Sequence, residues 1–336
     1  MILLCGVMTE GPMSAVYEAL VRIGGCVAVY DQRDVLETEV ALAVDSEVTG
    51  ELRTRGERID LNAVSAAYMR LYDSRQIPAV ARTPEESAER NHAVNVDDCL
   101  LSWADLTAAT VVNRPSAMAS NNSKPFQAEL IRAFGFDVPE TLITTDPEAA
   151  REFHTNHRDL IYKSISGVRS VVSRLGREDL DRLDDLVWCP TQFQQYVCGA
   201  DYRVHVVGDE VFACQITSDA DDYRYASRQG ADVDMETCNL PPELADRCRA
   251  LVAAMDLSFG GVDLRESPDG RWYCFEVNPS PAFTYYQSRS GQPIDEAVAR
   301  LLSSAHNTNL KTPGHSHAEG VVKTSQSDSA ASLCHP

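Results

Sequence analysis

Apolar runs and amphipathic segments alternate at the start of the chain. Ile2–Val7 and Cys26–Tyr30 are short apolar runs typical of buried strands, and Ser14–Ile23 between them has the spacing of an amphipathic helix. Ala66–Leu71 continues the series as a candidate strand, and Pro84–Thr107 as a long helix. Strand–helix–strand spacing of this kind predicts a small parallel α/β domain.

Shorter elements follow from the break at Asn113-Arg-Pro115 onward. The segments expected to be helical are Pro125–Phe134, Pro147–Phe153, Leu244–Met255 and Ile294–Leu302. The expected strands are Pro139–Thr144, Asp159–Lys163, Gln192–Val197, two strands within Tyr202–Ile216 joined at Gly208-Asp209, and a hairpin at Gly261–Asn278. This pattern divides the chain into residues 1–115, 116–197 and 198–304, followed by a polar tail at 305–336 that we expect to be disordered.

The hairpin carries the most informative pattern of polar residues. Ser267-Pro-Asp-Gly270 is a strong turn signal, and a turn centred on positions 268 and 269 places Asp263 opposite Cys274. Alternation then gathers on one face Asp263, Arg265, Glu276 and Asn278. The core face would hold Val262, Leu264, Tyr273, Phe275 and Val277.

In this register Asp263 and Glu276 are diagonal neighbours, with backbones roughly 7–8 Å apart, so that their carboxylates can converge on one cation. Two carboxylates and the amide oxygen of Asn278 are hard ligands that suit Mg²⁺. On pattern alone, the solvated polar face of an ordinary hairpin is an equal alternative.

Lysine is rare in this chain. It has four lysines, two of them in the polar tail, and arginine supplies the other 26 of its 30 basic residues. Lys124 begins a helix, and Lys163 ends a strand before a loop that contains Gly167. A compact ammonium reaches between phosphate oxygens where a planar guanidinium is too wide, so both lysines are candidates for nucleotide binding. Each taken alone also fits an exposed surface residue.

Charge and composition exclude several classes of function. A formal net charge of −20 argues against a nucleic-acid partner. No stretch reaches the ~18 apolar residues that cross a bilayer, and the N-terminus lacks the basic flank of a signal peptide. Ten cysteines without CxxC spacing favour reduced thiols over disulfides or a zinc site. We therefore expect a cytoplasmic protein with neither nucleic acid nor membrane as partner.

Eight short motifs follow one another in a specific order. They are Asn121–Gln127, Gly135–Leu142, Ile161–Lys163, Gln194–Val197, Asp201–Val204, Val207–Val211, Gly261–Asp263 and Phe275–Pro279. In this order and spacing, residues 113–302 resemble the ATP-grasp ligases and, within them, the RimK-type branch. The likeness is closer still to the graspetide (microviridin-type) synthetases, which cyclise side chains of ribosomal precursor peptides. Asn113–Ala117, Leu142–Pro147 and the glycine-poor loop after Lys163 carry that closer likeness.

The resemblance implies a mixed α/β and α+β fold. In it, a parallel pre-ATP-grasp domain (1–115) precedes a central ATP-grasp subdomain or lid (116–197) and a metal-bearing subdomain (198–304). It also implies that the protein binds ATP with one or two Mg²⁺ ions. The two lysines would contact the α- and β-phosphates, and the backbone of residues 195–197 would contact the adenine edge. The implied nucleotide-binding residues are Lys124, Lys163, Gln194, Gln195, Tyr196, Val197 and Asp201. The implied metal ligands are Asp263, Glu276 and Asn278, and the implied catalytic arginines are Arg203, Arg224 and Arg265. Gln195 departs from the family, which commonly has Glu at this position.

The implied reaction has two steps. A substrate carboxylate attacks the γ-phosphorus of ATP to give an acyl phosphate, and an amine or hydroxyl then displaces phosphate. The enzyme's main task is to align and neutralise anions. The acidic run Asp219, Asp221 and Asp222 before Arg224 is a weak candidate for a general base.

Three functions stay open. They are a macrocyclase acting on a precursor peptide, a RimK-like ligase that adds an amino acid to an acceptor, and a non-catalytic ATP-binding protein. The converged acids disfavour the third. The acceptor is expected to be a peptide or an amino acid, and the sequence leaves a homodimer open.

Overall fold

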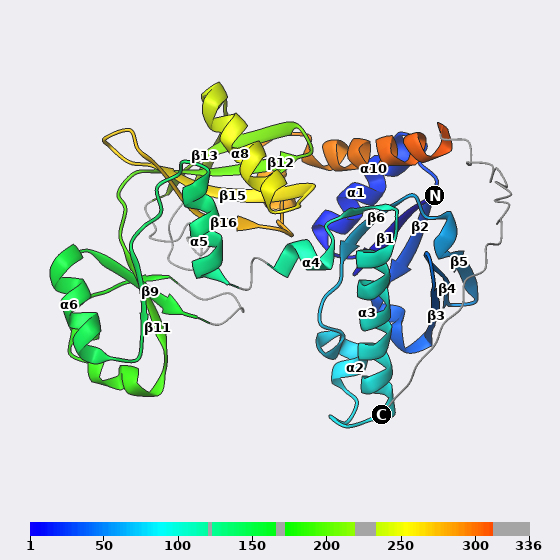
Figure 1. Cartoon of the computed structure of the whole chain (residues 1–336), viewed down its shortest axis with the longest axis horizontal. Coiled ribbons are helices and arrows are strands. Elements are labelled where there is room, and N and C mark those ends of the chain that lie inside the picture. The colour runs from blue at the N-terminus through cyan, green and yellow to red at the C-terminus, as the bar shows by residue number, and fades with distance from the viewer. Residues whose placement is uncertain (120–122, 166–171, 219–232, 312–336) are drawn as a thin grey trace, which may run out of the picture.

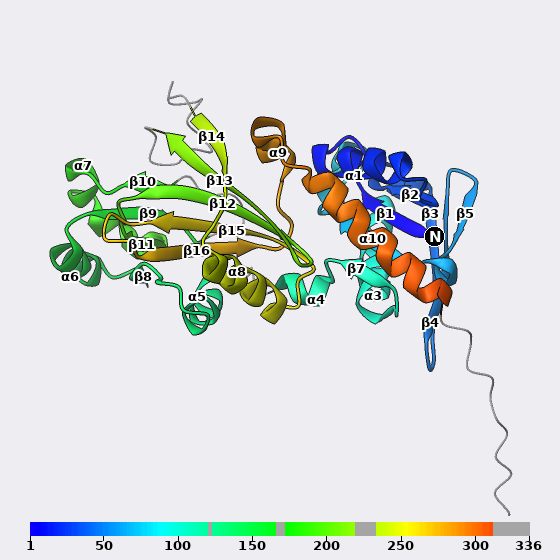
Figure 2. The ribbon, with the colours of Figure 1, turned by 90° about the horizontal axis from the view of Figure 1, so that it is seen from above.

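The computed structural model describes residues 1–119, 123–165, 172–218 and 233–311, with side chains up to Ser304 (Figure 1). The strands form four sheets, and the parallel one lies at one end of the molecule (Figure 2). Two antiparallel sheets follow along the long axis. Within these residues, no helix has both the length and the apolar character needed to cross a bilayer.

The N-terminal sheet is parallel, in the order β2-β1-β6-β7. Its strands are β1 (Ile2–Gly6), β2 (Val27–Asp31), β6 (Ala66–Arg70) and β7 (Thr110–Val112). The helices on its two faces are α1 (Gly11–Arg22), α3 (Ala88–Leu106) and α10 (Ile294–Lys311). Leu3 and Cys5 pack in the core shared with α3, whereas Ile2 and Leu4 pack in the core shared with α1 and α10. Burial on both faces explains the unbroken apolar run of β1, and the predicted parallel domain is confirmed.

Two boundaries differ from the sequence pattern. Helix α3 begins at Ala88 rather than at Pro84, because the Ser87 hydroxyl accepts a hydrogen bond from the Arg90 amide and caps the helix there. Helix α10 continues to Lys311, past position 305 at which the tail was expected to begin. Residues 312–336 lie outside the described part of the chain.

A small antiparallel sheet that the pattern does not predict is inserted between β2 and β6. Its strands are β3 (Thr38–Val44), β4 (Val48–Thr54) and β5 (Glu57–Asp60). Short helices surround it or follow it: η1 (Gln32–Glu37), η2 (Leu61–Ala63), η3 (Ser74–Gln76) and α2 (Pro78–Ala81). Charged residues interrupt the apolar ones in these strands, so the alternation is too weak to identify them from the sequence.

The central sheet is antiparallel, in the order β10-β9-β11-β8. Its strands are β8 (Thr141–Thr144), β9 (Leu160–Ser164), β10 (Ser173–Arg174) and β11 (Thr191–Gln195). The helices that cover it are α6 (Pro147–His157), α7 (Arg177–Leu180) and η5 (Leu183–Trp188). Leu160 and Phe193 face these helices and pack with Ala150 of α6, whereas the neighbouring Gln192 and Gln194 lie on the opposite face of the sheet.

The third large sheet has five antiparallel strands, in the order β14-β13-β12-β15-β16. The strands are β12 (Ala200–Val207), β13 (Glu210–Ser218), β14 (Val233–Cys238), β15 (Phe259–Glu266) and β16 (Trp272–Asn278). The helices around it are α4 (Pro115–Met118), α5 (Lys124–Ala133), α8 (Pro242–Ala254) and α9 (Thr284–Ser290). One face packs on α5 and α8 through Val204, Val262 and Val277, as the alternation of β15 predicts.

Asn113 ties the first domain to this sheet. Its Nδ2 donates hydrogen bonds of 2.6 Å to the carbonyls of Phe259 and Pro279, at the start of β15 and just after β16. Its Oδ1 accepts from the amides of Ser258 and Phe259. The side chain is 3% exposed and saturated with partners, so it fixes both ends of the hairpin relative to β7.

Candidate nucleotide and metal site

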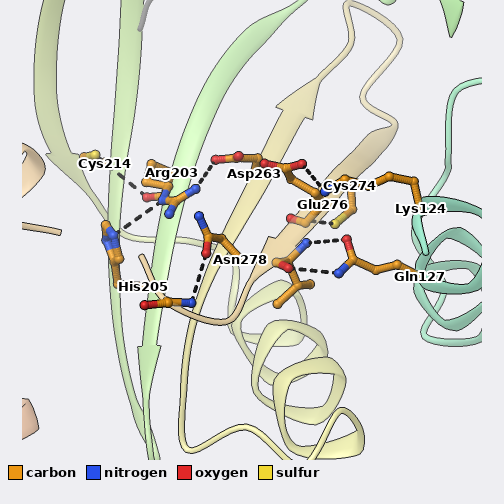
Figure 3. Close-up of polar contacts among 11 residues, drawn as sticks. Lys124, Gln127, Arg203, His205, Cys214, Asp263, Cys274, Glu276 and Asn278 are labelled. Carbon is orange, nitrogen blue, oxygen red and sulfur yellow. Dashed lines mark hydrogen bonds and ion pairs between the residues drawn. The ribbon is translucent and has the colours of Figure 1, made fainter. Parts of the chain in front are cut away.

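The second face of the five-stranded sheet carries rows of polar residues that cross its strands (Figure 3). In the central row Arg203 of β12 lies opposite Asp263 of β15, which lies opposite Glu276 of β16. Arg203 Nη1 donates to Asp263 Oδ1 over 2.6 Å, and Lys124 Nζ donates to Glu276 Oε2 over 2.7 Å. The two carboxylates predicted to bind metal are therefore adjacent, and each is neutralised by a cation predicted to bind phosphate.

The register of the hairpin differs from the predicted one. Asp263 lies directly opposite Glu276, neither opposite Cys274 nor diagonal to Glu276. The turn spans five residues, closed by a hydrogen bond from the Ser267 amide to the Arg271 carbonyl. A β-bulge between positions 263 and 264 then shifts the pairing by one further residue.

Because of the bulge, the residues of β16 that face the core differ from the predicted ones. Phe275 is the extra residue of β16, and its ring lies 5.3 Å from the Arg265 guanidinium rather than in the core. Tyr273 pairs with Arg265 and so shares the polar face. Cys274, opposite Leu264, takes the core position and is fully buried.

Helix α5 places Lys124 at this site. The Ser123 side chain caps the helix, and Lys124 is its first residue. One turn later the buried Gln127 side chain donates to the Val277 carbonyl (2.9 Å) and accepts from the Val277 amide (3.0 Å). Since β16 is the edge strand, Gln127 satisfies backbone groups that would otherwise lack a partner strand.

Gln127 was absent from the predicted site. Its signal in the sequence is its position three residues after Lys124, on the same helix face, where it is a polar residue among core positions.

A second row joins the sheet to the segment between β11 and β12. Arg265 donates to both carboxylate oxygens of Asp201, over 2.7 and 2.8 Å, and to the Val197 carbonyl over 2.6 Å. Asp201 lies opposite Arg265 across the strands. Two of these contacts hold Arg265 against β12, and the third anchors the segment of residues 195–197, called the hinge below.

Two hinge amides are already used within the fold. The Gln195 amide donates to the Glu140 carbonyl and the Tyr196 amide to the Asp159 carbonyl, each over 2.9 Å. The Gln194 side chain is buried and donates to Thr141 Oγ1 over 2.9 Å. Among the described residues, no backbone carbonyl accepts a hydrogen bond from the Val197 amide.

Lys163 lies on the face of the central sheet away from its covering helices. It pairs with Gln192, and the neighbouring Ile161 pairs with the buried Gln194. Tyr162 between them packs with the core on the covered side. Strand alternation therefore puts Lys163 on the face of the central sheet opposite its covering helices, and its role as a phosphate ligand stays a prediction.

Asn278 ends β16 opposite Gly261, in the row next to Asp263 and Glu276. Its Oδ1 accepts from the Ser280 amide over 2.9 Å, which fixes the side chain at the strand terminus. Two carboxylates and one amide oxygen fit Mg²⁺ by donor type. Within the described residues, no group of three or more His, Cys, Asp or Glu side chains converges, so no site of the zinc type competes with this one.

Some predicted residues cannot be placed. Arg224 and the acidic run Asp219, Asp221 and Asp222 lie outside the described residues, as does Gly167.

Comparison with known proteins identifies the family. A model of the RimK-like ATP-grasp domain matches residues 121–302, which is more than half of the chain. The chain therefore belongs to the RimK-like ATP-grasp family, and the resemblance read from its motifs is confirmed.

Solved structures match over nearly the whole chain. The ATP-grasp ligase PsnB, complexed with a phosphomimetic variant of a minimal precursor, Mg and ADP, is 28% identical, with a TM-score of 0.74. The match covers 91% of this chain and 98% of that one. The macrocyclase MdnC from Microcystis aeruginosa, bound with precursor peptide MdnA, has a TM-score of 0.75 and covers 90% and 100%. At 22% identity, MdnC supports the fold alone.

Sequence relatives match over shorter stretches. A D-alanine–D-alanine ligase from Chromohalobacter salexigens is 26% identical over 212 residues, which are 56% of this chain and 66% of that protein. The corresponding ligase of Halorhodospira halophila is 29% identical over 126 residues, 33% of this chain and 41% of that protein. The chain thus spans less than two thirds of the length of these curated relatives.

Proposed function

We propose that this protein is an ATP-dependent ligase that activates a carboxylate as an acyl phosphate and joins it to an amine or hydroxyl of a ribosomal precursor peptide. The observation that carries the proposal is the central row. In it Asp263 and Glu276 lie side by side, Arg203 donates to Asp263, and Lys124 donates to Glu276. Such a site suits the binding of a divalent metal together with a polyphosphate, because the carboxylates can bind the metal and the cations can bind the phosphates.

The residues of the row have complementary tasks when MgATP binds. Asp263, Glu276 and Asn278 would hold Mg²⁺, which neutralises phosphate charge. Arg203 and Lys124, released from the carboxylates, would then bind phosphate oxygens together with Lys163. The Val197 amide would receive the adenine edge, since its two neighbouring amides are engaged by Glu140 and Asp159. The acidic chain would thus present local positive charge only once its carboxylates coordinate metal.

The chemistry follows from this alignment. A carboxylate oxygen of the substrate forms a bond to the γ-phosphorus while the bond to ADP breaks. The acceptor nitrogen or oxygen then attacks the acyl carbon, and phosphate leaves with the pair of electrons. Arg203 is the cation best placed to balance charge at the transferred phosphoryl group, because its guanidinium points along the row of metal ligands.

A peptide acceptor is supported by PsnB, whose crystallised complexes contain a precursor, Mg and ADP and which this chain matches over 91% of its length. The D-alanine–D-alanine ligases favour the second candidate, a RimK-like ligase that adds a free amino acid.

We place the reaction in the cytoplasm, where MgATP is available. A homodimer stays a prediction.

Mass spectrometry separates the two candidates. The purified chain is incubated with MgATP and either precursor-type peptides or amino acids with a peptide acceptor, and phosphate release is followed. Loss of water from the peptide indicates cyclisation, and gain of a residue mass indicates amino-acid ligation. ATP turnover without either product would contradict the ligase proposal. Asp269→Asn, in the exposed hairpin turn, is the matched control variant.

A further inference from the structure

Arg203 is held by more than the carboxylate of Asp263. Its side chain is only 5% exposed, on the middle strand of the five-stranded sheet. Three further residues surround its guanidinium, and none of them belongs to the set predicted to bind ATP or metal: His205, Gly261 and Tyr286. They come from β12, β15 and α9, so only the assembled fold brings them together.

His205 contacts Arg203 from the same face of β12. Arg203 Nε donates to His205 Nε2 over 3.4 Å, and His205 is 1% exposed. Burial, and next the positive charge of Arg203, hold the pKa of His205 well below its ordinary value. The imidazole is therefore neutral, and a neutral imidazole can offer an unprotonated nitrogen as acceptor.

Gly261 provides the space in which the guanidinium lies. It is the cross-strand partner of His205. A Cβ at this position would overlap Arg203 Nη2 and would lie 2.9 Å from the Pro281 Cβ, so a larger residue would displace the arginine. The glycine is thus required by close approach of a side chain and not by an unusual backbone angle.

Tyr286 of α9 also lies against the guanidinium. Its ring centroid lies 5.2 Å from Arg203 Cζ, within the range of a cation–π contact. The ring also meets His205 edge-on at 5.1 Å between centroids, and it is buried beside Cys214 and Ile216. The arginine and the histidine therefore share one rigid aromatic wall.

We propose that His205, Gly261 and Tyr286 form a cradle that aims Arg203 at the transferred phosphoryl group, with His205 as the positioning residue. This inference rests on the proposed function. If Asp263 coordinates the metal, Arg203 would lose this carboxylate as a partner. The hydrogen bond from Arg203 Nε to His205 would then keep the guanidinium oriented. A neutral acceptor suits this task because it leaves the full positive charge available to phosphate, whereas a second carboxylate would compete for it.

The test compares nucleotides that differ in the γ-phosphate. Dissociation constants of MgADP and of Mg with the non-hydrolysable analogue AMPPNP are measured by calorimetry for the wild type, His205→Leu and His205→Gln. We expect His205→Leu to weaken AMPPNP about tenfold, the loss of one oriented hydrogen bond to a charged group, and to change MgADP by less than about twofold. The His205→Gln variant keeps a hydrogen-bond acceptor near the position of Nε2 and should restore most of the lost affinity for AMPPNP. His92→Gln, a substitution of a histidine that contacts the Thr38 carbonyl far from the site, should leave both constants unchanged.

A double-mutant cycle with Arg203→Lys tests whether His205 acts through the arginine. In the Arg203→Lys background, His205→Leu should weaken AMPPNP no further, whereas independent effects would add. In turnover with the peptide acceptor, His205→Leu should raise the KM for MgATP by up to about tenfold, in step with the loss of AMPPNP affinity, and should lower kcat by about 10²-fold.

Three results would overturn the cradle. They are equal losses of affinity for MgADP and AMPPNP in His205→Leu, additive losses in the double variant, and a His205→Gln variant that binds AMPPNP no better than His205→Leu. If His205→Leu does not fold, Tyr286→Leu reports on the same arginine, and an unchanged AMPPNP-to-ADP ratio there would also overturn it. A wild type that binds both nucleotides but forms no product would refute the proposed function, while the nucleotide comparison would still decide the role of His205.

Discussion

Two rows of the same sheet pair an arginine with an aspartate across β12 and β15, yet the pairs are built differently. In the hinge row, Asp201 with Arg265, three donors of the arginine are used, two by the carboxylate and one by the Val197 carbonyl. In the central row of Arg203, Asp263 and Glu276, called the metal row below, Arg203 donates to Asp263 through Nη1, and Lys124 donates to Glu276. The bidentate pair with its third bond to the hinge suits a structural role, whereas the adjacent carboxylates of the metal row suit exchange of their cation partners for metal.

The orientation of the two pairs is also reversed. The hinge row has its acid on β12 and its arginine on β15, and the metal row has the opposite order. Only in the metal row does the acid on β15 adjoin an acid on β16, because the bulge brings Glu276 opposite Asp263. The two rows therefore differ in both strand order and neighbouring charge, and the variants below test whether the metal row alone takes part in the chemistry.

The largest effect is expected in the metal row. Asp263→Asn with Glu276→Gln keeps the shape of both side chains and removes the charges that would hold Mg²⁺. Product formation should fall by at least about 10³-fold, because the phosphates lose the metal that neutralises them. Phosphate release and mass spectrometry of the peptide measure it, with Asp269→Asn as control. Unchanged product formation would show that the metal assignment is wrong.

In the hinge row we expect loss of stability before loss of chemistry. Arg265→Leu leaves the Asp201 carboxylate and the Val197 carbonyl without their partner, which should cost about 3 kcal/mol of unfolding free energy. Urea denaturation measures this cost, and Asp201→Leu in the same chain should recover part of it. If Arg265→Lys instead kept full stability and lost turnover, Arg265 would be a catalytic residue, as the family resemblance implies.

A smaller effect is expected for Lys124. The pair with Glu276 is partly exposed, with 38% of the lysine side chain accessible, so Lys124→Gln should hardly change the melting temperature. The affinity of the Lys124→Gln variant for MgADP should fall about tenfold, since a charged contact to phosphate is lost. Lys124→Arg should restore little of this, because a planar guanidinium does not replace a compact ammonium. Full affinity in the arginine variant would contradict the interpretation of the lysine-poor composition.

The smallest effect is a pH dependence of stability at His205, beside the metal row. The folded-state pKa is depressed, so below the ordinary value the unfolded chain takes up a proton that the folded chain refuses. Stability should therefore fall as the pH drops below about 6.5, by up to about 1.4 kcal/mol per pH unit, and be unaffected above it. Thermal melts of the wild type and His205→Gln at several pH values isolate this contribution. Parallel curves for the two proteins would mean that His205 has the same pKa in the folded and in the unfolded chain.

Much of the site was predictable from local pattern. Alternation along β15 and β16 was enough to put Asp263 and Glu276 on one face, and the cap-rich stretch before Lys124 was enough to start a helix there. The register was not predictable, because the five-residue turn and the bulge depend on how the strands pack, and Phe275 consequently left the core. The β3–β5 sheet escaped detection because its strands lack a clear apolar face.

The sequence by itself determined the strands and helices with a clear apolar pattern, the parallel N-terminal domain, the family and the chemical types gathered on the hairpin. Periodicity and motif order are properties of the chain itself. Only the tertiary structure decided which charge meets which. Arg203 meets Asp263 because β12 lies beside β15, and Lys124 meets Glu276 because Gln127 fastens α5 to the sheet edge. Partners so far apart in sequence are chosen by the packing of whole elements, which no local pattern contains.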